Sequence, residues 1–306
     1  MDGKGKGYMA LLITCTVWGT TWVVSKIGVK ELPALQMAYI RQFIAGLLFV
    51  GFFMLYRKMK LPGTKQFIWL TVMAVLMFVL ANGLSTWSLK FIPTGLAALI
   101  GALYPLSVVL IEWIFFKSKR MTILTFLGLF LGITGIGIVF YENAFGHFDA
   151  SFVLGLALSV IAMLAWSLGT VFLSRNKANL DPYYGTGWQM LISSLILFII
   201  AESTQPTIAL TSISGKAWAV IFYLVILGSV ISFVAFIYSM KKLPTAIASL
   251  YAYVNPLIAM VMAALVLKEK LTINILWGAI VTLSGVFLVN YSIKRDQAKI
   301  IVEAEM

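Results

Sequence analysis

Ten long apolar segments dominate this 306-residue sequence and limit the folds that it can adopt. A helix needs about 20 mostly apolar residues to cross the roughly 30 Å hydrocarbon core of a bilayer, and each segment is long enough. Their apolar residues run continuously and do not alternate with polar ones, which argues against the strands of a membrane barrel. The expected spans are residues 8–28, 33–56, 67–89, 93–116, 122–141, 151–173, 182–201, 217–240, 244–267 and 272–293.

The composition agrees with a membrane protein. Hydrophobic residues make up 61% of the chain and charged residues 11%, whereas a soluble domain carries about 25% charged residues. The net charge of +12 could suggest nucleic-acid binding. However, the basic residues stand in twos and threes between the apolar runs, as topology signals do. We therefore expect an all-α polytopic protein in the lipid bilayer, with no nucleic-acid partner.

The basic residues also predict the orientation of the chain. Clusters such as Arg57, Lys58 and Lys60 fall on the same side as the N-terminus when ten helices are assigned, and fewer basic residues fall on the other side. Lys and Arg are enriched in cytoplasmic loops, so both termini are expected to be cytoplasmic. The first apolar segment has no cleavage site of the signal-peptide kind before Trp18, which predicts a retained helix.

One phrase of the sequence occurs twice. Pro93, Thr94 and Pro105 recur as Pro244, Thr245 and Pro256, each 151 positions later. Two copies with five spans each would enter the membrane from opposite sides, which is the inverted repeat of many secondary transporters. The predicted units are residues 1–148, residues 149–293 and a cytoplasmic tail, 294–306. The alternative is that duplication only produced a stable helix bundle.

Several motifs together resemble those of a known family. They are Trp18-Gly19, Trp87-Ser-Leu-Lys-Phe91, Pro93-Thr-Gly-Leu-Ala-Ala-Leu-Ile100, Tyr104-Pro-Leu106, Pro244-Thr-Ala, Asn255-Pro-Leu257, Lys268-Glu-Lys-Leu-Thr272 and Trp277-Gly278. In order and spacing the chain resembles EamA-type members of the drug/metabolite transporter superfamily over essentially its whole length. The resemblance implies a carrier of small metabolites in the bacterial inner membrane, often an exporter of amino acids or related compounds.

Polar and aromatic side chains well inside the spans are candidates for binding the solute. Helical periodicity places Tyr251 and Asn255 on one face of their segment, and Tyr104 is the repeat partner of Asn255. Hydrogen bonding between helices, or anchoring of aromatic rings at the interface, would be the structural alternative. The substrate-binding candidates are Trp18, Arg41, Asn82, Tyr104, Trp166, Tyr251 and Asn255.

Two prolines and two charged residues complete the predicted site. Pro105 and Pro256 lie near the bilayer centre and are candidate hinges, because proline kinks a helix. Charges inside the bilayer are costly and point to function. Arg41 could bind a carboxylate or a phosphate, or could hydrogen-bond to helix-end carbonyls. Glu112 differs from Arg41 in depth by roughly 16 Å, so a direct pair is not expected; it has a structural role or takes part in proton coupling.

We therefore predict a secondary transporter that moves a small organic solute by alternating access, as an exporter, with proton or ion coupling open and no cofactor. A carrier of phosphorylated solutes or nucleotide-sugars is the alternative. No Walker-type phosphate loop is present. A membrane-embedded enzyme is disfavoured because the chain has one His, His147, and few buried carboxylates. Glycines at packing spacing, among them Gly128, Gly135 and Gly278, are expected to join segments five and ten.

Overall fold

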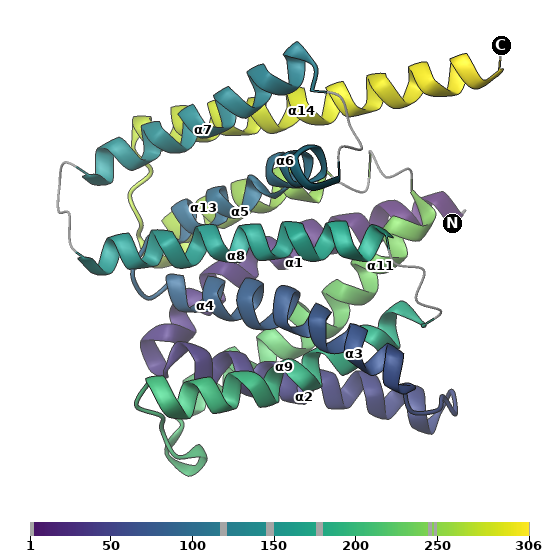
Figure 1. Ribbon diagram of the computed structural model, residues 1–306. Helices are drawn as coiled ribbons and strands as arrows, with labels where there is room; N and C mark the ends of the chain where they lie inside the picture. The colour runs from purple at the N-terminus through teal and green to yellow at the C-terminus, as the bar shows by residue number, and fades with distance from the viewer. Residues whose placement is uncertain are drawn as a thin grey trace.

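The computed structural model describes residues 3–116, 121–144, 150–175, 180–243, 247 and 250–305, and within these ranges it contains helices and no strand (Figure 1). Eight helical stretches are long and apolar enough to cross a membrane, and two shorter apolar helices bring the number in the described part to ten. The predicted fold class, an all-α polytopic membrane protein, is confirmed. The repeat residues Pro244 and Thr245 lie outside the described residues, as does His147.

The first five spans agree closely with the predicted segments. The third span is continuous in space but contains a π-helix, and the fourth is broken at Leu103. The elements are α1 (Gly3–Glu31), α2 (Ala34–Leu55), α3 (Thr64–Met73), η1 (Ala74–Gly83), α4 (Leu84–Ser88), α5 (Thr94–Ala102), α6 (Tyr104–Phe116) and α7 (Ile123–Ala144).

The second five spans follow the same order, again with a π-helix in the third of them. Residues 294–305, expected as a tail, continue the last helix. The elements are α8 (Ala150–Arg175), α9 (Pro182–Thr204), the short η2 (Leu210–Ser212), α10 (Gly215–Tyr223), η3 (Leu224–Ile231), α11 (Ser232–Lys242), α13 (Tyr251–Leu267) and α14 (Ile273–Glu305).

Local sequence explains where several helices begin. Pro33 and Pro93 directly precede α2 and α5 in extended backbone, because proline fixes φ and suits the entrance of a helix. The Asp181 carboxylate accepts hydrogen bonds from the backbone N–H groups of Tyr183 (2.9 Å) and Tyr184 (3.1 Å) at the start of α9. These bonds satisfy donors that a helix N-terminus leaves without partners.

The helices pack in layers that run across Figure 1, with the pair α7 and α14 along one edge and the pair α2 and α9 along the other. Glycines allow α7 and α14 to touch backbone to backbone. A Cβ atom at Gly128 would lie 2.6 Å from the carbonyl oxygen of Gly285, and one at Gly278 would lie 2.7 Å from that of Gly135. The glycines therefore join the fifth and tenth spans as expected.

The middle of the bundle exchanges helices between the two halves of the sequence. Helix α1 packs mainly against α13 and α11, which come from the second half. Helix α8 packs against η1, α4 and α6, which come from the first half. The two halves are thus interleaved, and neither forms a body with its own separate core. Both α1 and α14 place the chain ends on the same side of the bundle (Figure 1).

Candidate functional site

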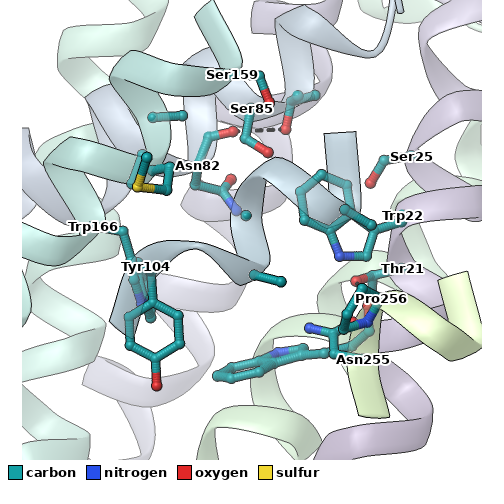
Figure 2. Close-up of a pocket in the computed structure, with 18 of the residues that line it drawn as sticks. Thr21, Trp22, Ser25, Asn82, Ser85, Tyr104, Ser159, Trp166, Asn255 and Pro256 are labelled. Carbon is teal, nitrogen blue, oxygen red and sulfur yellow. Dashed lines mark hydrogen bonds between the residues drawn. The ribbon is translucent and has the colours of Figure 1, made fainter. Parts of the chain in front are cut away.

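A cavity of about 190 Å³ lies among the central helices, between α1, α2, η1, α4, α5, α6, α8, α11 and α13 (Figure 2). Polar groups and aromatic rings make up much of its wall, which suits a site for a small amphipathic solute. All seven side chains predicted to bind the solute line this one cavity. They are Trp18, Arg41, Asn82, Tyr104, Trp166, Tyr251 and Asn255.

Arg41 brings a positive charge to this cavity from α2. The residue is 7% exposed, and its Nε donates a hydrogen bond to the hydroxyl of Ser229 on η3 (2.9 Å). Its two terminal nitrogens have no protein hydrogen-bond acceptor among the described residues. Among the described residues that line the cavity, Arg41 carries the single formal charge, and Asp and Glu are absent. A buried cation without a counter-ion is costly, so the arrangement favours an anionic ligand.

Aromatic rings form one wall of the cavity. The Trp18 ring meets Phe233 at 5.3 Å and Tyr251 at 5.5 Å between centroids, both edge to face. Tyr104 stacks on Tyr251 at 6.0 Å. The indole N–H of Trp18 donates to the carbonyl of Gly228 (3.2 Å), which fixes the ring across the cavity. These contacts place Trp18 as a rigid platform rather than as an anchor at the membrane interface.

Asn255 offers an unused polar group to the same space. Its Oδ1 is buried and has no hydrogen-bond partner within the described structure, and the residue lines the cavity one position before Pro256. Figure 2 shows Asn255 and Pro256 beside Thr21 on the α1 side of the cavity. A buried acceptor without a partner is rare, because desolvation costs free energy that no bond restores. A donor on a bound solute would satisfy it.

Comparison with known proteins identifies the kind of molecule to which this cavity belongs. The sequence model of the EamA-like transporter family matches residues 5–141 and again residues 153–291. The chain belongs to the EamA-like transporter family. The family agrees with the expected membrane carrier and points to transport rather than to catalysis.

Individual relatives of this EamA-like transporter cover most of its length. It is 30% identical over 255 residues to the uncharacterised inner membrane transporter YedA of Escherichia coli K12, covering 83% of this chain and 80% of the relative. It is 28% identical over 295 residues to the uncharacterised transporter YvbV of Bacillus subtilis 168, covering 96% and 95%. A solved crystal structure with a TM-score of 0.65 and 17% identity covers 94% of this chain and 97% of its own, and supports the fold.

The transporter has a second cavity, of about 270 Å³, between η1, α8, α9 and α11. Trp166 and Phe233 line both cavities, so these two rings stand between them. The second cavity extends to the connection between α8 and α9, where Leu180 and Asp181 line it. The two cavities therefore lie on either side of a shared pair of aromatic rings.

Polar contacts tie the helices together at the other end of the central cavity. Leu89 lines the cavity, and the ammonium group of Lys26 on α1 donates to the carbonyls of Leu89 (2.5 Å) and Ile92 (2.9 Å). Glu269, which follows α13, accepts from the backbone N–H (3.0 Å) and the hydroxyl (2.7 Å) of Thr94 at the start of α5. Helices α1 and α13 are thereby tied to the turn between α4 and α5.

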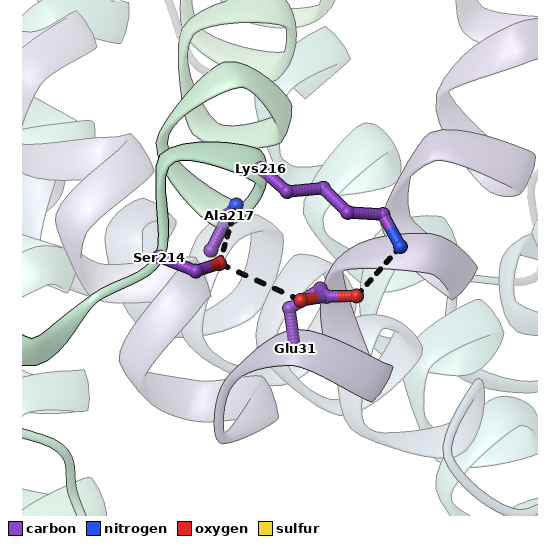
Figure 3. Close-up of polar contacts among 4 residues, drawn as sticks. All are labelled: Glu31, Ser214, Lys216 and Ala217. Carbon is purple, nitrogen blue, oxygen red and sulfur yellow. Dashed lines mark hydrogen bonds and ion pairs between the residues drawn. The ribbon is translucent and has the colours of Figure 1, made fainter.

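A third contact at this end joins α1 to α10 (Figure 3). Glu31 accepts from the Lys216 ammonium group (2.8 Å), and the Ser214 hydroxyl lies 3.5 Å from its other oxygen. Ser214 also accepts from the backbone N–H of Ala217 (3.1 Å) and so caps α10. The last turn of α1 is therefore held from two directions.

The two hinge candidates differ in the structure. The span that contains Pro105 is broken immediately before it: α5 ends at Ala102, and α6 begins at Tyr104. Pro256 lies inside the continuous helix α13 and lines the cavity. Proline removes one backbone donor in either case, but only the first site shows an interrupted helix among the described residues. Their role as hinges stays a prediction.

Glu112 lies away from the cavity, near the ends of its helix and of α8. It pairs with Arg175 at 3.8 Å, and the Arg175 guanidinium stacks over the ring of Phe116 at 3.9 Å. Arg41 and Glu112 do not pair, in agreement with their predicted difference in depth. Glu112 does not line the cavity, and its role, structural or in proton coupling, stays a prediction.

Sequence reasoning missed the groups that the π-helices supply. Helix η1 presents the carbonyl of Phe78 to the side chain of Gln42, and η3 presents that of Gly228 to Trp18. The pattern of apolar residues in a sequence does not predict where a π-turn occurs, although such turns are frequent at functional sites. The cavity residue Phe233 was also missed, because a Phe within an apolar segment is indistinguishable from one that faces lipid. Gln42 could have been found from the sequence only because it stands next to Arg41, as a second polar residue inside an apolar segment.

Proposed function

We propose that this EamA-like transporter carries a small metabolite with a carboxylate group, such as an amino acid, through alternating access. The observation that carries the proposal is Arg41: a buried residue whose guanidinium has one hydrogen bond, from Nε, and which lines a cavity with no Asp or Glu among its described residues. Its planar fork of donors matches the two oxygens of a carboxylate. A bound carboxylate would supply the negative charge that the cavity wall does not provide for Arg41.

The remaining wall supports a solute with one charged end and an apolar body. Trp18, Trp22 and Trp166 offer aromatic faces, and the partnerless Oδ1 of Asn255 offers an acceptor for an ammonium or hydroxyl group. The single cationic residue balances one carboxylate. A phosphorylated solute at neutral pH carries a charge of about −1.5 to −2 and would be left partly uncompensated.

The size of the cavity also favours a small solute. At about 190 Å³ it is somewhat larger than an engineered protein cavity of ~150 Å³ that holds benzene. A molecule of the size of leucine fits this volume, whereas a nucleotide-sugar is several times larger. The volume of the central cavity therefore favours the smaller solute over a nucleotide-sugar.

The packing supports an inverted arrangement of residues 1–148 and 149–293. A two-fold axis in the membrane plane would exchange α1 with α8, and it would exchange the partners of α1 with those of α8. Helix α1 packs on the eighth and ninth spans, and α8 packs on the third and fourth. The self-paired contacts α2–α9 and α7–α14 are those that such an axis requires. The two matches to the family model also divide the chain at this point.

The proposal of alternating access rests on a difference between the two ends of the central cavity. With both termini in the cytoplasm, the contacts of Lys26 and Glu269 close the outer end, and the second cavity lies toward the cytoplasm. The solute would enter from the cytoplasm past Trp166 and Phe233, bind at Arg41 and leave when the outer contacts open. Export is the direction that the family favours. The moving groups would mix helices of both halves, because α1 packs on α11 and α13.

The test is exchange in liposomes that contain the purified protein. Labelled L-leucine, L-alanine and a uridine diphosphate sugar are offered outside to vesicles loaded with the same unlabelled compound. We expect exchange of an amino acid without ATP, and an increase in KM of about tenfold or more in Arg41→Met, because a charged hydrogen bond is lost. Lys90→Met, which removes an exposed cation outside the cavity, is the matched control and should leave KM unchanged.

Two outcomes would contradict the proposal. Exchange of the nucleotide-sugar alone would favour the alternative carrier. Equal KM values for an amino acid in the unaltered protein and in Arg41→Met would remove Arg41 from the solute site, provided that the variant is equally monodisperse in detergent.

A further inference from the structure

We propose that Gln42 is a positioning residue that turns the amide nitrogen of Asn82 toward the cavity and so makes the site selective for a carboxylate. This inference rests on the proposed function. Gln42 does not line the cavity itself; it is 2% exposed and follows Arg41 on α2. Its side chain contacts three residues in two other elements, Phe78 and Asn82 in η1 and Ser193 in α9, and these contacts fix the direction of each of its hydrogen bonds.

The backbone of η1 decides how Gln42 is oriented. The carbonyl of Phe78 can only accept, so the Gln42 atom beside it at 3.2 Å must be the donor Nε2. The other amide atom, Oε1, then accepts the hydroxyl of Ser193 on α9. The reverse orientation would set two carbonyl oxygens against each other inside the bundle, without water to separate them.

The orientation of Gln42 in turn decides that of Asn82. The second hydrogen of the Gln42 Nε2 group points to the side chain of Asn82 at 3.1 Å, and only Oδ1 of Asn82 can accept it. The Nδ2 group of Asn82 is therefore the end directed away from Gln42. It has no protein acceptor in the described structure, and Figure 2 shows the Asn82 side chain pointing into the space between Trp22 and Tyr104.

The result is a second donor group on the wall to which Arg41 belongs. Two N–H groups of Asn82 and the terminal N–H groups of Arg41 are offered to the cavity, whereas an amide turned the other way would offer an oxygen. An oxygen would repel a carboxylate and attract a cation. Since Asn and Gln amides have nearly the same shape in both orientations, the choice depends on the relay from Phe78 and Ser193 through Gln42.

The π-helix makes this relay possible. Asn82 and Phe78 lie four residues apart in η1, and both meet the same Gln42 amide. In the second half, the carbonyl of Gly228, in η3, receives Trp18 instead. The two π-helices thus present equivalent carbonyls to different side chains, so only the η1 side of the cavity gains an oriented amide.

The test compares ligands that differ only at the two ends of leucine. Binding of L-leucine, 4-methylpentanoate and L-leucinol to the purified protein is measured by isothermal titration calorimetry. 4-Methylpentanoate keeps the carboxylate and lacks the amine, whereas L-leucinol keeps the amine and lacks the carboxylate. In Gln42→Leu we expect the affinity for 4-methylpentanoate to fall about tenfold, while that for L-leucinol is unchanged.

Gln42→Glu is the sharper variant, because a carboxylate accepts where Gln42 donates. It would draw the Nδ2 group of Asn82 to itself and turn Oδ1 into the cavity. We expect 4-methylpentanoate binding to fall further than in Gln42→Leu, and L-leucinol binding to be kept or strengthened. Ser193→Ala should show the same selective loss in weaker form, and Ser193→Thr, which retains the hydroxyl, should restore selectivity.

The outcomes separate this inference from the proposed function. Equal losses for both probes would assign Gln42 a merely structural role and overturn the inference, as would unchanged affinities in all Gln42 variants. If 4-methylpentanoate and L-leucine fail to bind the unaltered protein, the proposed carboxylate site at Arg41 is refuted, and this inference is refuted with it. A loss in Arg41→Met without any selective loss in the Gln42 variants would leave the proposed function standing alone.

Discussion

Glu269 provides the most direct test of the closed outer end. Its carboxylate accepts from the N–H (3.0 Å) and hydroxyl (2.7 Å) of Thr94 and from the N–H of Gly95 (3.4 Å). It thus caps α5 from the end of α13 and adds a negative charge at a helix N-terminus, where such a charge is favourable. These contacts exist only while α13 and α5 stay together at this end.

Glu269→Gln keeps the size of the side chain and removes the charge. Hydrogen bonds to a charged group contribute about 1.5–3 kcal/mol, against about 1 kcal/mol for neutral ones. The closed state should therefore lose about 1.5 kcal/mol relative to a state that is open to the outside. Such a change raises the ratio of open to closed molecules roughly tenfold, because 1.4 kcal/mol is a factor of ten. The shift is independent of the identity of the solute.

The assay is the labelling of a cysteine in the cavity. Ser25 lines the cavity next to Lys26, and the natural Cys15 is buried and can be replaced by Ala. In whole cells, Ser25→Cys should react with a membrane-impermeant thiol reagent several-fold faster when Glu269→Gln is present. Glu202→Gln is the matched control. Glu202 is exposed, and its carboxylate accepts a hydrogen bond from Thr207, five residues further along the chain. Equal labelling rates in all three backgrounds would refute the reasoning.

Two further predictions concern stability and coupling. Gly135→Ala should lower the thermal unfolding temperature of the purified protein, because its Cβ would lie 2.6 Å from the Gly278 carbonyl, whereas Gly137→Ala meets nothing within 4 Å and should be neutral. Equal effects of the two changes would contradict the close packing of α7 and α14. Glu112→Gln should lower stability by about 1 kcal/mol or less, because Arg175 is partly exposed. It should leave the response of amino-acid exchange to a pH gradient unchanged; loss of that response would restore Glu112 as the coupling residue.

The sequence by itself determined the class of protein and several of the polar and aromatic groups in the cavity wall. Ten apolar runs predict ten spans because a bilayer accepts only segments of that length and leaves no other way to satisfy the backbone. Polar side chains such as Arg41 and Asn255 turn inward for a related reason: hydrocarbon offers them no partner. The seven predicted residues met in one cavity because each was chosen as a polar or aromatic group well inside a span, away from the membrane interface.

Tertiary structure decided the features that depend on more than one helix. The π-turns at η1 and η3 place Phe78 and Gly228 where side chains of α2 and α1 complete their hydrogen bonding. The direction of the Asn82 amide depends on three helices at once, through Gln42 and Ser193. Local sequence encodes a span one segment at a time, whereas an amide orientation is set by the partners that packing brings to it. For this reason the sequence could name Asn82 but could not say which of its two ends faces the solute.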